Sequence, residues 1–433
     1  MASPLHVHVL GAMPKGNVGT IAAQRALYEF LMDIIKSDLS VSTNDKETFK
    51  RYHPGFENKE VYDQLWSIIF KKYITNYIFW VTFTFLNLVI FMFISSFIRI
   101  GIKIPFKIKT INRIKKCDLL IDLNLEFLRG IPISLSPMLI KQKPRVIIIH
   151  KIFWSYRIFF NLWFNFIVKA AFKKRLIIGP ASFGPFKELP FLVKQFIKFI
   201  LNHFVDLKLV REPVSAKFLD EIGVKDYIVV TDIALTVKRN SFVNIKNRNS
   251  RFMIGVAPAI PKYILTKEEV ENYIYAHAKC LDELVKRYNA TIIFLPSSSD
   301  DVSVCKLIIA KMCNKDHVKT IITNDVDEYE SWIRKLKLLI TTKMHPSILA
   351  ARNFIPFVTL IYDHKQIGIL QQIGLKKFSL MINKVSYNNL MELINEAFLS
   401  LSKIEEILKL NIPLLQNKAI IKLNYVFLSL IKK

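Results

Sequence analysis

The chain has 433 residues, which is enough for two or three domains, and hydrophobic residues make up 52% of it, with 33 phenylalanines. Its four cysteines include no C-x-x-C pair, which argues against a zinc ribbon or a disulfide framework and fits a reducing compartment. The formal net charge of +27 suits nucleic acid, anionic lipid or phosphorylated substrates as partners.

A glycine-rich turn follows the first predicted strand. Residues 5–24 read LHVHVLGAMPKGNVGTIAAQ, which indicates a strand, a turn and the start of a helix. Gly11 and Gly16 have the spacing of a Walker A loop, but Asn17 and Val18 stand where that loop needs Lys and Ser/Thr. A dinucleotide G-x-G-x-x-G fingerprint is also excluded, because no two glycines of this turn are separated by one residue.

The same turn has a generic capacity to hold an anion. Gly16 and Gly19 allow the backbone to approach a ligand closely, and Thr20 can cap a helix that begins at Ile21. Free N–H groups at the start of a helix favour an anion. A tight turn without a ligand is the alternative, and the sequence leaves both interpretations open.

One segment has the length and composition of a membrane helix. Residues 77–98 carry no charge and would form a helix ~33 Å long, with basic residues on both sides. Residues 146–172 mix large aromatic side chains with lysine and arginine, which is typical of a helix in a membrane interface. A packed internal helix is an equal alternative for this second segment.

The predicted strands argue against a full crossing of the membrane. Residues 40–64 are polar and are expected to be rich in loops, and further strands are predicted before and after the apolar stretch. The later ones lie in residues 115–124, 174–185, 206–223 and 226–235. A parallel sheet needs all its strands in one compartment. We therefore expect an apolar helical insertion at about 65–105 that enters one leaflet without crossing it.

A polar, basic linker at residues 238–251 separates two α/β units. Strands and helices alternate again after it, and the chain ends in a mostly helical tail that we expect to be interrupted at Pro413. The predicted domains are an N-terminal Rossmann-like domain, a C-terminal Rossmann-like domain and the tail, at residues 1–240, 251–385 and 386–433. Two Rossmann-like domains of this kind face a cleft.

Polar residues follow several of the predicted strands, where ligands of open α/β sheets bind. In the segment REPVS, Arg211 and Ser215 come just after a strand, and Pro213 starts the next helix. Arginine offers a planar fork for a carboxylate or a phosphate. An ordinary ion pair between Arg211 and a surface acid is the alternative.

Two later strand ends add positive charge. The segment TTKMHPS places Lys343 and His345 between a buried strand and a helix opened by Pro346, and YDHK ends the next strand with Lys365. Neighbouring strand ends would gather these three side chains in one pocket. The result would be a cationic site with one group that titrates near neutral pH.

The ordered set of motifs resembles the polysaccharide pyruvyl transferase family. That family has an N-x-G-type turn near the N-terminus, a strand ending in iGP, an R-[DE]-x-x-S segment, a strand ending in R-x-H, and a P-F-V-x-L-x-Y-D-x-K strand. The matching residues are Asn17 to Thr20, Ile178 to Pro180 followed by Ser182 to Pro185, Arg211 to Ser215, Lys343 to His345, and Pro356 to Lys365. The resemblance covers nearly the whole chain except the apolar insertion.

The resemblance implies a GT-B-like fold and transfer of a pyruvyl group from phosphoenolpyruvate onto sugar hydroxyls, usually as a ketal, with no cofactor and no metal. His345 is the expected proton-transfer residue. The expected substrate-binding residues are Arg211, Lys343, Lys365, Ser215, Asn17 and Gly19. Of these, the three cations would bind carboxylate and phosphate, and the turn around Gly19 would line the opposite wall.

Two positions depart from the family pattern. Lys343 replaces the arginine before the histidine, and a lysine cannot make a bidentate contact with a carboxylate. Thr20 stands where an acid often follows the N-x-G turn. Altered carboxylate recognition, a different acceptor or loss of activity would each be consistent with these changes.

Two further functions stay open. A GT-B glycosyltransferase using a nucleotide sugar would suit the fold, although only Asp325 and Asp327 are placed for a ribose after the predicted strand at 318–325. An inactive membrane-bound scaffold would suit the two departures. Nucleic-acid binding is disfavoured, because no RNP, helix-turn-helix or zinc-finger pattern is present.

The composition and the resemblance together predict where the protein acts and what it contacts. We expect an enzyme that is peripheral or monotopic at the cytoplasmic face of the cell membrane. Its expected partners are phosphoenolpyruvate, an anionic membrane surface and a glycan acceptor of the cell envelope or one linked to a lipid. The start of the chain, MASPLHVHV, lacks the basic region and apolar core of a secretory signal.

Overall fold

The structure is a computed structural model. It describes residues 4–12, 18–43, 45–56, 60–63, 109–123, 169–237, 252–261 and 265–431, together with Ser155, Ile158, Leu162 and Phe166. Asn17, the apolar stretch at 77–98 and most of 146–172 lie outside the described residues, so the predicted insertion stays a prediction. Within the described part of the chain, no helix is both long and apolar enough to pass through a bilayer.

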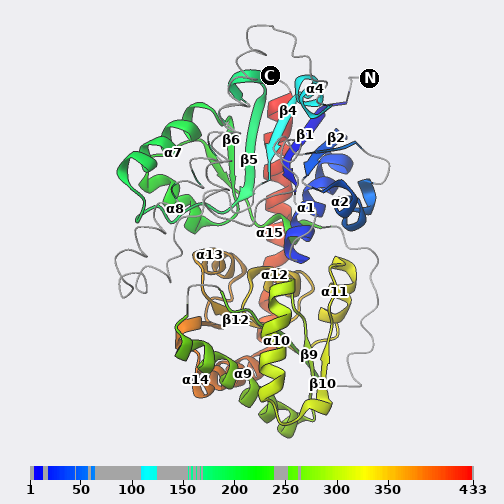
Figure 1. The fold of residues 1–433 in the computed structure, drawn as a ribbon, viewed down its shortest axis with the longest axis vertical. Helices are drawn as coiled ribbons and strands as arrows, with labels where there is room; N and C mark the ends of the chain where they lie inside the picture. Colours follow the sequence, from blue (N-terminus) through cyan, green and yellow to red (C-terminus); the bar gives the residue numbers. More distant parts are fainter. Residues whose placement is uncertain are drawn as a thin grey trace, which may run out of the picture.

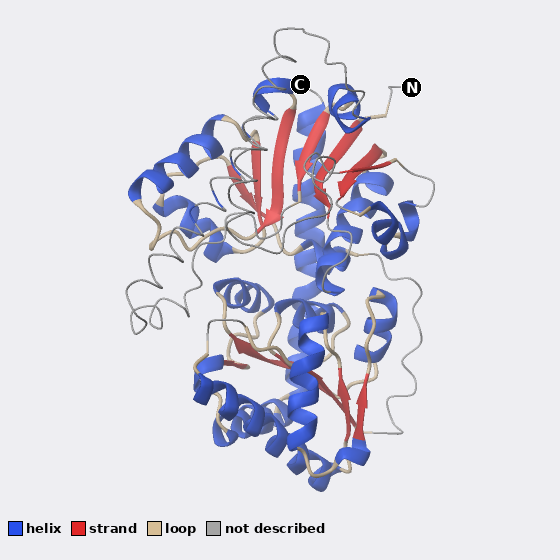
Figure 2. Ribbon diagram, viewed as in Figure 1, coloured by secondary structure: helices blue, strands red, loops and turns tan. Residues whose placement is uncertain are grey.

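Two parallel sheets form the framework, one in each α/β unit (Figure 2). The first has seven strands in the order β3-β2-β1-β4-β5-β6-β7. These are β1 His6–Ala12, β2 Asp38–Thr43, β3 Val61–Asp63, β4 Leu119–Asp122, β5 Arg175–Ala181, β6 Leu207–Val210 and β7 Tyr227–Val229. All neighbouring pairs are parallel. Parallel sheets of this kind are covered by helices on both faces.

The second sheet has six strands in the order β10-β9-β8-β11-β12-β13, again with parallel pairs. Its strands are β8 Met253–Ala257, β9 Thr291–Phe294, β10 Val318–Thr320, β11 Leu338–Thr341, β12 Phe357–Ile361 and β13 Ser379–Met381. Both sheets reverse their order beside a central strand, which makes them doubly wound. The two predicted Rossmann-like units are therefore confirmed.

Helices cover the two faces of the first sheet differently. Helices α1 (Val18–Glu29) and α15 (Leu401–Ile431) lie on one face, and α7 (Phe191–His203) and α8 (Pro213–Glu221) lie on the other (Figure 1). Alternate residues of the strands point to the two sides. For example, Val9 packs with α1, whereas Leu10 packs in the cluster that contains α7.

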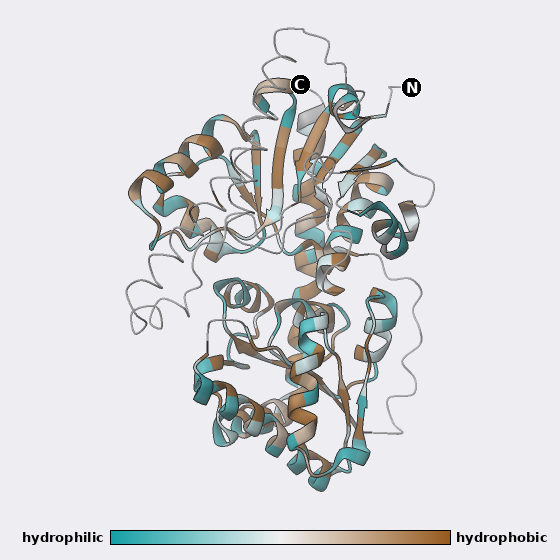
Figure 3. Cartoon of the chain, in the orientation of Figure 1, coloured by the Kyte–Doolittle hydropathy of each residue, from teal (hydrophilic) through white to brown (hydrophobic). Residues whose placement is uncertain are grey.

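The remaining helices cover the second sheet and the edges of the first. They are α2 Lys46–Tyr52, α4 Lys109–Lys116, α9 Lys267–Tyr288, α10 Ser299–Lys311, α11 Val326–Ile333, α12 Met344–Arg352, α13 His364–Ile373 and α14 Tyr387–Leu399, with short 3-10 turns such as η3 Ile233–Thr236. Apolar residues concentrate in the strands and the inner helix faces of both units (Figure 3). One continuous apolar core runs through both units by way of α1, η3, α12 and α15.

The region expected to be rich in loops contains an inner strand of the first sheet, β2, so that expectation is wrong. Strand β2 has the sequence DLSVST and is almost entirely buried. Its serines are satisfied inside the protein, because Ser40 and Ser42 bond to the two ring nitrogens of His8 at 2.8 and 2.7 Å. A buried strand whose polar residues have hydrogen-bond partners inside the protein looks like a loop when only the polarity of its sequence is considered.

The C-terminal residues form α14 and one long helix, α15. The predicted interruption at Pro413 is wrong, because α15 continues through that residue. Proline removes a single backbone hydrogen bond from a helix interior. Here the helix is held on both sides of that point. Leu408 and Ile412 are buried before it, and Gln416 and Phe427 contact the first unit after it. The predicted domain boundaries stay predictions, and α15 contacts both units.

Candidate active site

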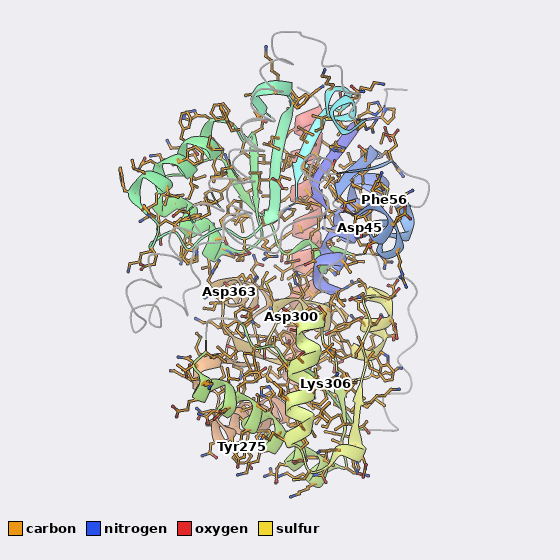
Figure 4. The ribbon with its side chains drawn as sticks, viewed as in Figure 1. Asp45, Phe56, Tyr275, Asp300, Lys306 and Asp363 are labelled. Atoms are coloured by element: carbon orange, nitrogen blue, oxygen red, sulfur yellow. The ribbon has the colours of Figure 1, made fainter. Side chains whose placement is uncertain are left out.

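The carboxyl ends of the two sheets meet where the units join. Helix α1 contacts α11 and α12, and α8 contacts α13. The backbone N–H of Val18, at the start of α1, donates to the carbonyl of Ser297, which follows β9, at 3.0 Å. Asp363 and Asp300, labelled in Figure 4, lie at the edge of the second unit that faces the first. Ligands of open parallel sheets bind at such edges.

Arg211 follows β6 and is almost completely buried, with 2% of its surface exposed. Its Nε donates to Ser182 Oγ at 2.6 Å, and its Nη1 donates to Asp232 Oδ2 at 3.1 Å. Its Nη2 is buried without a partner among the described residues. A buried guanidinium N–H that lacks an acceptor is costly, and an anionic ligand would satisfy it.

His345 comes from the opposite unit and reaches the same carboxylate. It lies in the first turn of α12, and its Nε2 is 4.0 Å from Asp232 Oδ2. Arg211 and His345 therefore meet on one oxygen atom of Asp232. The sequence predicts that Arg211 and His345 belong to one substrate site, and the structure brings these two residues together from different units.

Gly19 completes the contact between the units at this point. It lies in the first turn of α1, and a β-carbon placed on it would be 1.9 Å from both Cβ and Cγ of His345. Two real carbon atoms cannot approach this closely, so only glycine allows α1 and α12 to meet in this way. Gly19 and His345, both predicted site residues, are thus direct neighbours. Asn17 lies outside the described residues.

Ser215 stands in the first turn of α8, where it holds neighbouring groups in place. Its Oγ accepts the backbone N–H of Phe183 at 2.8 Å, lies 2.9 Å from the Phe183 carbonyl, and contacts Glu212 Oε1. Glu212 also accepts from Ser182 Oγ at 3.0 Å. Complete burial raises the pKa of Glu212, against the lowering effect of Arg211. Ser215 and Glu212 therefore fix the loop that carries Arg211.

Lys343 is engaged within its own unit. Its Nζ lies 2.8 Å from Ser298 Oγ and 2.8 Å from both carboxylate oxygens of Asp301, which is 3% exposed. Asp301 also accepts from the backbone and the hydroxyl of Ser297. The ammonium thus neutralises a buried acid at the start of α10, and its predicted role as an anion ligand stays a prediction.

Lys365 lies in the first turn of α13 and is 6% exposed. Its Nζ is 3.7 Å from Asp363 Oδ2, and Asp363 forms a capping box with Gln366. Lys365 and His345 come from adjacent strand ends, as the sequence predicts, since β11 and β12 pair directly.

Gln366 joins the two loops that carry these residues. Its Oε1 accepts the backbone N–H groups of Tyr362 and Asp363 at 2.9 and 3.1 Å, and its Nε2 donates to the Thr342 carbonyl at 2.9 Å. The loop after β12 is thereby bonded to the loop that leads into α12. This amide fixes the relative position of Lys365 and His345.

Two important residues were missed by sequence reasoning. Asp232 comes three residues after the end of β7 at Val229, in the segment VVTDIAL, so the rule for strand ends was sufficient to indicate it. Gln366 stands three residues after Asp363, which is the spacing of a capping box. Neither signal distinguishes a site residue from an ordinary helix cap without the tertiary contacts.

The architecture defines an α/β protein with a GT-B-like fold. UDP-GlcNAc 2-epimerase from Neisseria meningitidis bound to UDP-GlcNAc is 13% identical, with a TM-score of 0.58 over 98% of this chain and 100% of that one. The S. aureus MnaA–UDP co-structure is 12% identical, with a TM-score of 0.58 over 99% and 98%. HepE from Anabaena in complex with UDP-glucose is 11% identical, with a TM-score of 0.53 over 99% of both chains.

These identities establish the fold alone, and a family comparison goes further. The model of the polysaccharide pyruvyl transferase family matches residues 103–364, which is more than half of the chain. The chain therefore belongs to the polysaccharide pyruvyl transferase family, and it is a transferase. No curated protein matches it by sequence.

Proposed function

We propose that this protein transfers a pyruvyl group from phosphoenolpyruvate to sugar hydroxyls of a cell-envelope or lipid-linked glycan, releasing phosphate. The observation that carries the proposal is the meeting of Arg211 and His345 on Asp232 Oδ2, with a buried Arg211 N–H left to bind an anion. A small dianionic donor needs fixed positive charge beside a proton donor, and this edge offers both.

The chemistry begins with a proton. His345 would donate it to the methylene carbon of phosphoenolpyruvate, so that C2 becomes electrophilic and a sugar oxygen bonds to it as the hydroxyl loses its proton. The C2–O bond to phosphate then breaks, and the second hydroxyl closes the ketal and loses its proton. The two sugar hydroxyls release two protons in all. One of them restores the proton that His345 gave to the methylene carbon, and the other leaves on the phosphate.

The residues around His345 have roles that follow from their contacts. Asp232 would stabilise the imidazolium through the oxygen 4.0 Å from Nε2. Arg211 would bind the donor carboxylate or phosphate through Nη2, and Lys365 would supply a second cation from the neighbouring loop. Gly19 and the start of α1 would form the wall opposite α12, toward the acceptor.

A nucleotide-sugar donor is the competing function, since the solved structures named above contain UDP, UDP-glucose or UDP-GlcNAc. Its two sequence candidates for a ribose contact are already engaged. Asp325 caps α11 by accepting from the Glu328 N–H, and Asp327 pairs with Arg25 of α1 at 2.8 Å. Family membership also favours the pyruvyl donor.

The experiment measures phosphate release from phosphoenolpyruvate by purified protein with cell-envelope and lipid-linked glycans as acceptors. We expect release by the wild type and loss of about 10² to 10⁴ in rate for His345→Gln, because a general acid contributes a factor of that order. His203→Gln is the matched control, since His203 is an exposed histidine on α7.

The same preparation is tested for thermal stabilisation by phosphoenolpyruvate and by UDP. Stabilisation by phosphoenolpyruvate alone supports the proposal. Stabilisation by UDP with an inert phosphoenolpyruvate would replace it with the glycosyltransferase function. Equal phosphate release by wild type and His345→Gln would remove His345 from the mechanism.

A further inference from the structure

The outward face of α15 carries a stripe of large apolar side chains. Leu410, Leu414, Ile421, Tyr425 and Leu428 are each between 49% and 72% exposed. On a helix of 3.6 residues per turn, their spacing places all five within about 60° of one another. At a rise of 1.5 Å per residue the stripe is about 27 Å long. The exposed Asn417 lies between Leu414 and Ile421 on this face, so the stripe consists of two apolar groups. Exposed apolar clusters of this kind mark interaction sites.

The opposite face of the same helix is fixed to the protein. Leu423 and Phe427 are buried, and the Phe427 ring lies 5.6 Å from the ring of Phe30. Gln416 donates to the Leu235 carbonyl, and Lys422 donates to the Val229 carbonyl at 2.6 Å. These contacts prevent the helix from rotating to bury its stripe, so the apolar face is a permanent part of the surface.

Charge identifies the partner. Between Leu410 and Leu428 the helix carries Lys418 and Lys422 and no aspartate or glutamate, whereas Glu405 and Glu406 lie before the stripe, where Glu405 pairs with Lys409 at 2.9 Å. Pairing of this stripe with that of a second copy would bring Lys418 and Lys422 of both copies together without an acid inside the stripe to offset them. An anionic bilayer offers the complementary charge, and an apolar stripe with lysines beside it is typical of a helix that lies in a membrane interface.

We propose that the outer face of α15 is a membrane-contact surface that seats the protein on anionic lipid. Leu410 to Leu428 would enter the boundary between headgroups and acyl chains, with Tyr425 at the headgroup level and Lys418 on lipid phosphates. This surface lies in the described part of the chain and is separate from the apolar segment at 77–98. It does not depend on the donor chemistry proposed above.

A second apolar face provides a matched control. Phe191, Leu192 and Phe199 of α7 are also exposed, and α7 has lysines and no acid. Because α7 and α15 cover opposite faces of the first sheet, the two faces cannot rest on one flat bilayer together. A comparison of the two therefore shows which side of the protein the membrane contacts.

The experiment measures binding to vesicles of phosphatidylcholine alone and of phosphatidylcholine with phosphatidylglycerol in equal parts. We expect wild-type binding to the anionic vesicles, and binding at least about tenfold weaker for the variant Leu414→Gln/Ile421→Gln/Tyr425→Gln, since the burial of apolar side chains in the bilayer is the main source of the affinity. The variant Phe191→Gln/Leu192→Gln/Phe199→Gln should bind as the wild type does. Both should keep their melting temperature and their phosphate release with a soluble acceptor.

A local probe tests contact directly. Cys313 is the exposed cysteine and the other three are buried, so an environment-sensitive fluorophore on Tyr425→Cys in a Cys313→Ser background reports one site. We expect its emission to shift to the blue with anionic vesicles and to be quenched by brominated acyl chains. An unchanged emission, or weaker binding only in the α7 variant, would overturn the proposal.

Two other outcomes would also overturn it. A fluorophore already shielded from water without vesicles would show that the protein itself covers this face. A wild-type dimer in lipid-free buffer that becomes a monomer in the α15 variant would make the stripe an interface between copies. Loss of phosphate release with normal vesicle binding would count against the proposed function and leave the membrane surface intact.

Discussion

Gly19 and His345 pack so closely that no side chain fits between them, because a β-carbon on Gly19 would lie 1.9 Å from the Cβ of His345. The two residues belong to different α/β units. This contact therefore fixes the imidazole relative to the start of α1, and it makes the position of His345 depend on how the two units are packed.

Replacement of Gly19 by alanine should move His345. We expect Gly19→Ala to lower the rate of phosphate release by about 10²-fold, since a displacement near 1 Å in a catalytic group has a cost of that order. The control is Gly55→Ala, because a β-carbon on Gly55 meets nothing within 4 Å. Kinetics and melting temperatures of both variants check the prediction, and equal rates in both would contradict it.

Replacement of Asp232 by asparagine should affect both stability and catalysis. The change removes one of the two buried carboxylates beside Arg211 and leaves only Glu212, so we expect a loss of up to about 3 kcal/mol in the free energy of unfolding. Asparagine can still accept the Ala234 N–H that Oδ1 accepts now, so the turn after β7 should persist.

Denaturant unfolding measures the stability, and the pH dependence of kcat measures the effect on His345. We expect the pH profile of kcat to move to lower pH in Asp232→Asn, because the imidazolium loses a nearby negative charge. A stable variant with an unchanged profile would show that Asp232 only supports Arg211.

Two substitutions separate the roles of Lys343. Lys343→Gln leaves Asp301 buried without its cation, so we expect a clearly lower melting temperature. Adding Asp301→Asn removes that buried charge and should recover much of the loss. If pairing with Asp301 is the main role of Lys343, KM for phosphoenolpyruvate in the double variant should stay within about threefold of the wild type. A KM that stays high in the double variant would instead assign Lys343 to the donor.

The stability should fall in mild acid because of His8. Burial, with the charge of Arg113, lowers the pKa of His8 from 6.5 to about 3. Between these values the unfolded chain binds a proton on this residue and the folded protein does not, so folding becomes less favourable as the pH falls.

The contribution of His8 is at most about 1.4 kcal/mol per pH unit in the free energy of unfolding. His8→Gln should therefore give a shallower dependence of stability on pH between about 6 and 4 than the wild type does. His203→Gln, an exposed position, should leave the slope unchanged. Parallel curves for wild type and His8→Gln would refute the assignment.

Much of the fold follows from local patterns in the sequence. Runs of Val, Ile and Leu before Gly, Pro or polar residues predict the strands of both units, and Pro213 starts α8 as expected. Strand β2 was missed because Ser40 and Ser42 are polar, and only their bonds to His8 inside the protein make them suitable for a buried strand. Pro413 likewise indicates a break that the contacts of α15 override.

The sequence by itself determined the class of fold, the family and the positions of Arg211, His345 and Lys365 at strand ends, because these depend on residue type and on spacing along the chain. Only the tertiary structure decided that Arg211 and His345 share Asp232, that Lys343 pairs with Asp301, and that Gly19 touches His345. Each of these contacts joins residues far apart in the chain. Such contacts depend on how helices and strands pack, which no local pattern specifies.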